Sequence, residues 1–314
     1  MTERAAGGEI VPEVSLHLGA HRTSTTRAQA IMARAQTTGR LKHTFYAGPG
    51  EVRRLAGLAA IVIDRAPFTA RLASPWLLRR AVPSLAEAIS AKTQAVVISE
   101  ETLLGVIDRS IRTGEGLYPE AGLRAQTLRR LLRGADVRPV IAVRSYADWF
   151  ASAYATVVRR RPLPEPAALA TEWAALPRGW PEIVAEIIGA FGRCDVVRFE
   201  DLHWDKEIML RALTPGEVDR LPRNRVRFFP SMSAAAIREL GMWRAAGRKF
   251  DTATLNAMIE RHRGTPGLKP FAAADREALD ARYAADLDQV TALGGQFVEP
   301  VNALVGGGRT AGRS

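Results

Sequence analysis

The chain reads Val14-Ser-Leu-His-Leu-Gly-Ala-His-Arg-Thr-Ser-Thr-Thr26 near its N-terminus, where an apolar run leads directly into a short polar loop. Val14 to Leu18 have the alternating character of a β-strand, and Gly19 permits a tight turn after it. Thr25 and Thr26 are expected to begin a helix, whose free N–H groups and positive dipole end would face the loop. This layout predicts a cradle for a phosphate or sulfate group.

Further apolar runs repeat this strand-then-helix arrangement along the chain. Strands are predicted at residues 41–47, 95–99, 137–143 and 194–199, with amphipathic helices between them. From about residue 205 the pattern is almost entirely helical. We therefore expect an α/β protein with a three-layer fold of the P-loop type, in which helices flank a central parallel sheet and the C-terminal third is helical. The sequence from 51 to 92 is mainly helical in pattern, although three prolines interrupt it.

The length of the chain, 314 residues, suits one domain, which we expect to span residues 13–304. Residues 1–12 and 305–314 are expected to be disordered tails. No apolar run approaches the roughly 20 residues needed to span a membrane, and the N-terminus lacks the apolar segment of a signal peptide. Cys194 is the only cysteine, which excludes a disulfide within the chain and fits a reducing cytoplasm.

The formal net charge of +11 makes an anionic partner natural. Only five of the 44 basic residues are lysines, and the arginines are scattered through amphipathic helices with no aromatic residues interleaved. No known nucleic-acid motif accompanies them. An anionic cofactor or substrate is therefore expected, and nucleic acid is not.

The polar loop does not match the phosphate loop of kinases and NTPases. That pattern is Gly, four residues, Gly, Lys, then Ser or Thr. Laid on Gly19, it puts Ser24 in place of the second glycine and Thr25 in place of the lysine, so that only Thr26 agrees. The positive charge lies inside the loop instead, at Arg22.

With its charge in this position, the segment Arg22-Thr-Ser-Thr-Thr26 resembles the 5'-phosphosulfate loop of sulfotransferases that use 3'-phosphoadenylyl sulfate (PAPS). Bacterial members often carry a histidine before the basic residue, as His21 does here. The chain departs from the family pattern where Arg22 replaces a lysine and Ser24 replaces a glycine. The resemblance implies a cofactor-binding loop made of Gly19, His21, Arg22, Thr23, Ser24, Thr25 and Thr26.

A second signature of the same family is an arginine at a strand end followed eight residues later by a serine, and both residues grip the 3'-phosphate of the cofactor. Arg144 and Ser152 have this spacing. Eight residues are slightly more than two helical turns, so both side chains can face the cleft at the strand ends. Arginine supplies a permanently charged fork for phosphate, and serine adds a neutral donor. The resemblance covers about residues 14–202.

The family resemblance implies transfer of a sulfuryl group from PAPS to a hydroxyl or amine, with no metal. Arg22 would neutralise charge that develops on the leaving nucleotide. A general base should take the acceptor proton, and relatives use histidine or glutamate for this. Glu101 is the first choice because Ser99-Glu-Glu101 matches a Ser-x-Glu pattern of bacterial members; Glu100 and His43 are rivals.

The acceptor, a small molecule or a glycan, is expected to contact the glycine-containing loops at 105–122 and 261–269, the first of which has the length of a lid. Late in the region of resemblance, Glu200 and Asp201 are expected to cap the next helix. Two other functions stay open: a catalytically degenerate nucleotide-binding protein of the same fold, and, less favoured, a P-loop kinase or NTPase. The sequence does not indicate an oligomeric state.

Overall fold

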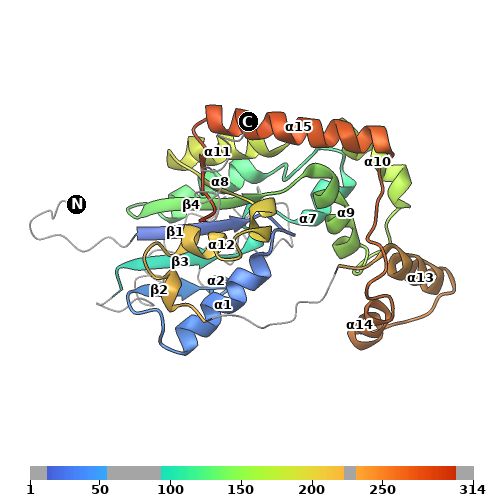
Figure 1. Cartoon of the computed structure of the whole chain (residues 1–314), viewed down its shortest axis with the longest axis horizontal. Coiled ribbons are helices and arrows are strands. Elements are labelled where there is room, and N and C mark those ends of the chain that lie inside the picture. The colour runs from blue at the N-terminus through green and yellow to red at the C-terminus, as the bar shows by residue number, and fades with distance from the viewer. Residues whose placement is uncertain (1–12, 55–92, 223–230, 302–314) are drawn as a thin grey trace, which may run out of the picture.

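The centre of the molecule is a parallel sheet of six strands in the computed structural model, which describes residues 13–54, 93–222 and 231–301 (Figure 1). The strand order is β2-β3-β1-β4-β5-β6, and every neighbouring pair is parallel. The strands are β1 (Glu13–Gly19), β2 (Thr44–Ala47), β3 (Ala95–Ser99), β4 (Asp136–Val143), β5 (Asp195–Arg198) and β6 (Gln296–Phe297). The expected parallel sheet is confirmed.

Strand β1 shows why the alternating apolar pattern forms the middle of the sheet. Val14, Leu16 and Leu18 are fully buried and belong to the larger hydrophobic core on one face. Ser15 and His17 are buried on the other face, because successive side chains of a strand point to opposite sides. The neighbours β3 and β4 divide their apolar residues between the two faces in the same way, so the sheet is covered on both sides.

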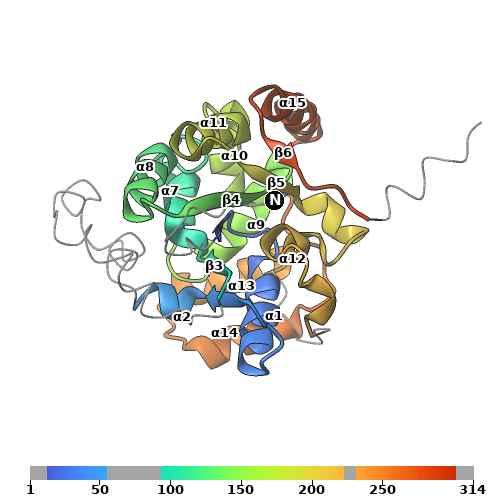
Figure 2. The same ribbon diagram turned by 90° about the vertical axis from the view of Figure 1, so that its left-hand side faces the viewer.

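The helices lie in two layers around the sheet (Figure 2). One face carries α1 (Thr25–Thr37) and α12 (Ile208–Leu213), whose apolar residues form the smaller core. The other face is covered by α8 (Ala121–Leu131), α9 (Tyr146–Val157), α11 (Trp180–Phe191) and α15 (Ala273–Ala292). The expected three-layer α/β architecture is therefore confirmed.

The remaining elements in the described parts of the chain are short or lie at the ends of the sheet. They are α2 (Pro49–Val52), η1 (Glu101–Leu104), α7 (Ile107–Arg112), α10 (Pro166–Ala175), η2 (Phe199–His203), η3 (Val218–Arg220), α13 (Ala234–Ala245) and α14 (Thr252–Arg261). Helices α13 and α14 lie together beyond the end of α9 (Figure 1). The C-terminal third is helical as expected, except for β6, which extends the sheet beside β5.

The prediction of a long loop from 105 to 122 was wrong in part, because the segment contains helix α7 and two fully buried residues, Leu117 and Tyr118. Two of its glycines, Gly116 and Gly122, allow close packing. Gly116 has a φ of +83°, and a Cβ there would lie 2.6 Å from the carbonyl oxygen of Arg178. A compact turn of this kind cannot be told from an open loop by composition alone.

Some expectations fall outside the described residues. These are the tails at 1–12 and 305–314 and most of the helical pattern from 51 to 92, of which only α2 and the two residues after it are described. Within the described ranges, no helix combines the length and the apolar character needed to cross a membrane.

Candidate functional site

The loop after β1 lies where the strand order reverses. The strands that follow β1 in sequence, β2 and β3, lie on one side of it, and β4 lies on the other. In open parallel sheets, ligands bind outside the carboxyl ends of the strands at such a switch point. Ala20 ties the loop to the neighbouring strand, because its N–H donates to the carbonyl of Ala142 at 3.2 Å.

The backbone of this loop turns sharply into α1. Gly19, Arg22 and Ser24 all have positive φ values, of 100°, 67° and 64°. Ser24 is the residue before the helix, and no side chain of the described residues caps the helix N-terminus. The first N–H groups of α1 therefore face the loop without a side-chain acceptor, and they carry the positive end of the helix dipole. This is a backbone arrangement that binds anions.

Arg22 extends from the loop to the two residues of the second predicted signature. Its Nε donates to the hydroxyl of Ser152 at 2.7 Å, and its backbone carbonyl accepts from Nη1 of Arg144 at 2.9 Å. Its Nη2 also donates to the hydroxyl of Ser231. The structure thus brings Arg22, Arg144 and Ser152 together, although more than 120 residues separate the loop from the other two.

The two arginines are cations held close together in partly buried positions. Burial lowers the pKa of the Arg22 guanidinium, and the nearby charge of Arg144 lowers it further. Burial also lowers the pKa of Arg144, whose guanidinium lies 4.2 Å from the ring centre of Phe199. Nε of Arg144 is buried and has no hydrogen-bond partner in the structure. An anion placed between these groups would relieve their repulsion and supply the missing acceptor.

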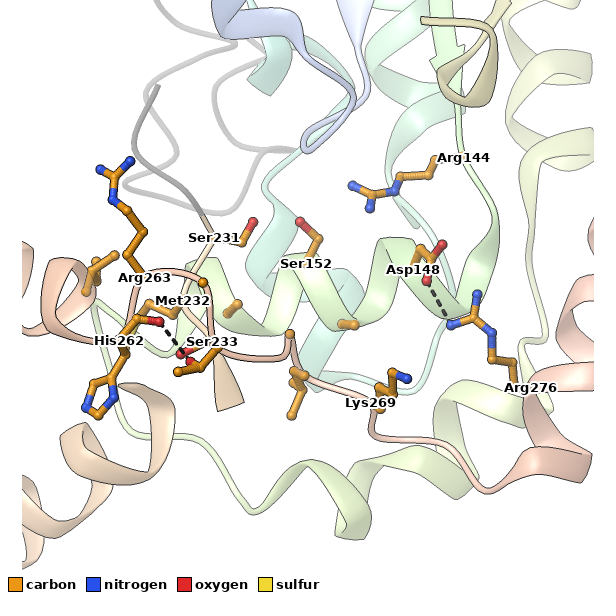
Figure 3. Close-up of a pocket in the computed structure, with 17 residues that line it drawn as sticks. Arg144, Asp148, Ser152, Ser231, Met232, Ser233, His262, Arg263, Lys269 and Arg276 are labelled. Carbon is orange, nitrogen blue, oxygen red and sulfur yellow. Dashed lines mark hydrogen bonds and ion pairs between the residues drawn. The ribbon is translucent and has the colours of Figure 1, made fainter. Parts of the chain in front are cut away.

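A pocket of about 350 Å³ opens at this point, and we call it the Arg144 pocket (Figure 3). Arg144, Asp148 and Ser152 form the side that belongs to β4 and α9. The opposite side comes from the residues before α13, the segment after α14 and the first turn of α15, including Ser231, Met232, Ser233, Arg263, Lys269 and Arg276. Arg276 is paired with Asp148 at 2.9 Å, whereas Lys269 makes no ion pair with any described residue. The pocket therefore has an excess of positive charge.

The 261–269 segment, which was expected to contact an acceptor, lines the pocket of the second signature. The structure places Arg263 and Lys269 in the same pocket as Arg144 and Ser152. Its basic residues and glycines were visible in the sequence. Their position relative to Arg144 depends on the packing of α13 and α14, for which no sequence pattern was available.

Of the two carboxylates after β3, only Glu101 faces the loop. Its Oε2 accepts from the hydroxyl of Thr25 at 2.5 Å, and a Cβ on Gly19 would lie 3.4 Å from its Cα. Glu100 is buried, accepts from the N–H and hydroxyl of Thr102, and pairs with Arg53 at 3.2 Å. Glu100 thus stabilises the start of η1, while Glu101 is placed to act at the loop.

His43, the other rival for the role of base, lies just before β2 at the amino edge of the sheet, and it is exposed. Arg22 and Glu101 lie at the carboxyl edge. Because the strands are parallel, this separation removes His43 from the site.

His21 is held by three hydrogen bonds from residues that the sequence did not single out. Its N–H donates to the hydroxyl of Tyr118 at 2.8 Å, Nδ1 lies 3.0 Å from the same hydroxyl, and its carbonyl accepts from the indole of Trp149 at 3.0 Å. Burial lowers the pKa of His21 below 6.5, against the opposing charge of Glu101, so the ring is neutral at pH 7. No sequence signal for Tyr118 exists, since it occurs in a segment that resembled an open loop.

The hydroxyl groups of the loop divide into two kinds. Thr23 donates to the carbonyl of Ala20 at 2.6 Å and Thr25 donates to Glu101, so both are used within the protein. Ser24 and Thr26 are exposed, and no hydrogen bond of their side chains occurs within the described residues. Ser24, Thr26 and the backbone N–H groups are therefore the donors that the loop offers to a ligand.

Glu200 does not cap the helix that follows it, and that prediction was wrong. Its Oε1 accepts from the N–H of Ser145 at 3.0 Å, at the start of α9, and its Oε2 accepts from the hydroxyl of Tyr283 at 2.9 Å. Asp201 pairs with Arg198 at 2.7 Å. Glu200 therefore stabilises the turn that positions Arg144.

Comparison with known proteins assigns no family. Neither the known family models nor the curated proteins include a match to this chain. Within the described residues, no group of three or more His, Cys, Asp or Glu side chains is arranged to hold a metal ion.

Proposed function

We propose that the protein is a sulfotransferase that transfers a sulfuryl group from PAPS to a hydroxyl or amine of an acceptor. The observation that carries the proposal is that Arg22 contacts both Arg144 and Ser152, which line one pocket. Two phosphate-binding features were inferred separately from the sequence, and a nucleotide with phosphate at both ends of its ribose requires that they lie side by side.

The residues of the Arg144 pocket and of the loop before α1 fit such a nucleotide. The buried Nε of Arg144 lacks an acceptor, Lys269 carries a charge without an ion-pair partner among the described residues, and the N-terminus of α1 is uncapped. Phosphate oxygens would satisfy all three groups. In this proposal, Arg144 and Ser152 hold the 3'-phosphate, and the N–H groups at Ser24, Thr25 and Thr26 hold the 5'-phosphate.

When bound, PAPS supplies a sulfuryl group joined to a good leaving group. Arg22 lies between the two phosphate grips, where its charge stabilises the negative charge that builds up on the 5'-phosphate oxygen. Its planar fork, unlike a lysine ammonium, stays protonated throughout. The hydrogen bonds to Ser152 and Ser231 fix the guanidinium before the reaction begins.

Glu101 is the proposed general base. The hydroxyl of Thr25 holds one carboxylate oxygen, which leaves the other oxygen to accept a proton from the acceptor. The acceptor oxygen or nitrogen forms a bond to sulfur, the bond between sulfur and the 5'-phosphate oxygen breaks, and the acceptor proton passes to Glu101. The second product is adenosine 3',5'-bisphosphate (PAP).

The test is a thermal-shift measurement with PAP and, separately, with ATP and Mg²⁺. We expect PAP to raise the Tm in a dose-dependent way and ATP with Mg²⁺ to have little effect, because residue 25 is not the lysine that an NTPase loop requires. Stabilisation by the ATP complex alone would overturn the proposal in favour of a kinase or NTPase.

A degenerate protein that binds the nucleotide without turnover is the second candidate. It is favoured by the contacts of Arg22, whose side chain is already bonded to two serines. Incubation with ³⁵S-labelled PAPS and a mixed set of acceptors separates the two candidates. Binding of PAP without any labelled product would assign the degenerate role.

A further inference from the structure

A second pocket, of about 290 Å³, lies on the other side of the Arg22 loop, between η1, α7 and the end of α9. We call it the α7–α9 pocket. His21 and Thr102 form its wall nearest the loop, and the rest of the wall is made by Val106, Ile107, Asp108, Arg109, Thr156, Val157, Arg160 and Arg161. The residues assigned to nucleotide binding through the Arg144 pocket do not line it.

The two pockets are separated by α9 and by two consecutive residues of the loop. Arg22 reaches Ser152 at the Arg144 pocket, and His21 lines the α7–α9 pocket. On α9, Ser152 and Thr156 line different pockets and are one helical turn apart. The two pockets therefore approach each other at consecutive loop residues and within about one turn of α9.

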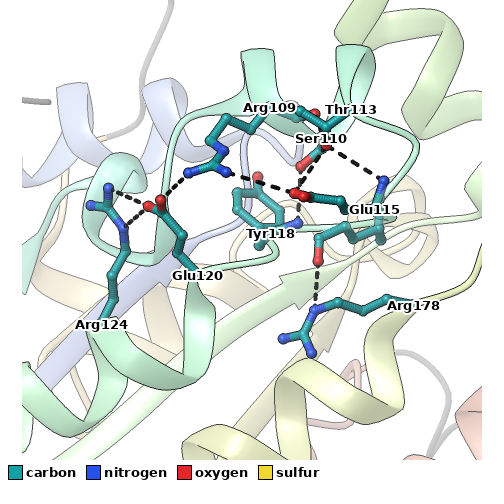
Figure 4. Close-up of polar contacts among 9 residues, drawn as sticks. Arg109, Ser110, Thr113, Glu115, Tyr118, Glu120, Arg124 and Arg178 are labelled. Atoms are coloured by element: carbon teal, nitrogen blue, oxygen red, sulfur yellow. Dashed lines mark hydrogen bonds and ion pairs between the residues drawn. The ribbon is translucent and has the colours of Figure 1, made fainter. Parts of the chain in front are cut away.

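The α7–α9 pocket has an excess of positive charge at one position. Arg109 is neutralised by Glu120 and by Glu115 at 3.7 Å, as Figure 4 shows. Arg161 is paired with Asp108 at 3.2 Å. Arg160 makes no ion pair with any described residue, and its charge contributes to the lowered pKa of His21. The pocket is thus suited to a ligand with one acidic group near Arg160.

The rest of the wall limits the size and polarity of the ligand. Val106, Ile107 and Val157 supply an apolar surface. The volume is at the lower limit for ligand pockets, so it admits about one six-membered ring with its substituents. Glu101, the proposed base, immediately precedes Thr102 of the wall.

We infer that the α7–α9 pocket binds the acceptor, and that the acceptor is a single-ring hydroxyl compound with a carboxylate that pairs with Arg160. This inference rests on the proposed sulfotransferase function. The carboxylate at Arg160 and the apolar contacts orient the ring, so that its hydroxyl points toward Glu101 and Arg22. An aromatic hydroxy acid and a uronic acid share this chemistry, and the test distinguishes them.

The experiment measures binding by calorimetry to the full chain, with and without saturating PAP, for two matched pairs of probes. One pair is 4-hydroxyphenylacetate and its neutral amide, and the other is glucuronate and glucose. We expect the acid of one pair to bind at least tenfold more tightly than its neutral partner. Arg160→Gln should reduce this preference to less than twofold, and Arg160→Lys should keep most of it. Arg133→Gln, which removes an exposed arginine outside both pockets, should change nothing.

The outcomes separate this inference from the proposed function. Normal PAP binding with no preference for either acid, or a preference that survives Arg160→Gln, overturns the acceptor assignment and leaves the sulfotransferase proposal standing. Absent PAP binding with an Arg160-dependent preference for acids supports the pocket assignment and counts against the sulfotransferase proposal.

Discussion

The Arg144 pocket and the α7–α9 pocket share helix α9 but are built in different ways. The Arg144 pocket joins segments that are far apart in sequence, from Arg144 and Ser152 to Ser231 and Lys269. Apart from His21, the α7–α9 pocket comes from two short segments, 102–109 and 156–161. The first pocket therefore depends on the topology of the sheet and the packing of α13 and α14. The second can change through a few local substitutions, as expected of a site that selects among acceptors.

The strongest test of this division is Glu101→Gln, which removes the proposed base where the two pockets meet. The amide keeps the size of the side chain and can still accept from Thr25, but it cannot take a proton. We expect kcat to fall by roughly 10²–10⁴, while the Kd for PAP changes less than twofold. Single-turnover assays with labelled PAPS and calorimetry measure the two quantities.

Two further variants serve as controls for Glu101→Gln. Glu207→Gln alters an exposed carboxyl just before α12, outside both pockets, and should leave kcat unchanged. Glu100→Gln should affect mainly stability, since Glu100 is buried and paired with Arg53. A large loss of kcat in Glu100→Gln, with full activity in Glu101→Gln, would transfer the role of base to Glu100.

The second test compares Arg144→Ala with Arg22→Ala. Arg144 is assigned to the ground-state grip on phosphate, so its removal should weaken PAP binding by about 100-fold. Arg22 is proposed to stabilise the negative charge that develops on the 5'-phosphate oxygen during transfer. Its removal should therefore lower kcat by roughly 10²–10³ and weaken PAP binding much less. Calorimetry measures the change in PAP binding, and single-turnover assays measure the change in the rate of transfer. Equal and small effects of both changes would contradict the assigned roles.

The third test concerns Lys269, which the sequence associated with the acceptor and the structure places in the Arg144 pocket. Lys269→Ala should weaken PAP binding by about tenfold and leave the Kd of the acceptor unchanged. Lys249→Ala removes the same charge from an exposed position outside the pocket and serves as the control. If Lys269→Ala changed acceptor affinity alone, the original assignment of this segment would be restored.

The smallest effect is expected at Ser24. Its φ of 64° lies in the left-handed region, which costs a non-glycine residue about 1–2 kcal/mol. Glycine removes this cost, but it also increases the conformational entropy of the unfolded chain, which lowers the free energy of unfolding by about 0.4–1 kcal/mol. Ser24→Gly should therefore raise the free energy of unfolding by up to about 1 kcal/mol, seen as a small rise in Tm by calorimetry. Ser24→Ala, which keeps the Cβ, should bring no such gain.

Much of the fold follows from local patterns in the sequence. The run at 14–18 alternates apolar and polar residues, and the runs at 95–99 and 137–143 are short and rich in β-branched residues; each of the three forms a strand. The placement of Arg144 and Ser152 at one pocket was also expected, from the family resemblance together with a spacing of slightly more than two helical turns. Strand β6 could not be predicted, because its two residues are too few to show a hydrophobic periodicity.

The parts of the site that could not be predicted depend on contacts between distant segments. Tyr118 fixes His21 across 97 residues, and Ser231 meets Arg22 across 209 residues. Neither residue belongs to a motif, and hydroxyl groups are common in any chain. Only the folded arrangement identifies which of them reach the loop.

Arg144 holds residue 22 through its backbone carbonyl, not through its side chain. Any amino acid at position 22 presents the same carbonyl. Lysine and arginine at this position would therefore preserve the same connection between the two strand ends. Under the proposed function, the side chain that meets the transferred group can be exchanged without removing this connection, which makes position 22 a natural target for redesigning the rate of transfer.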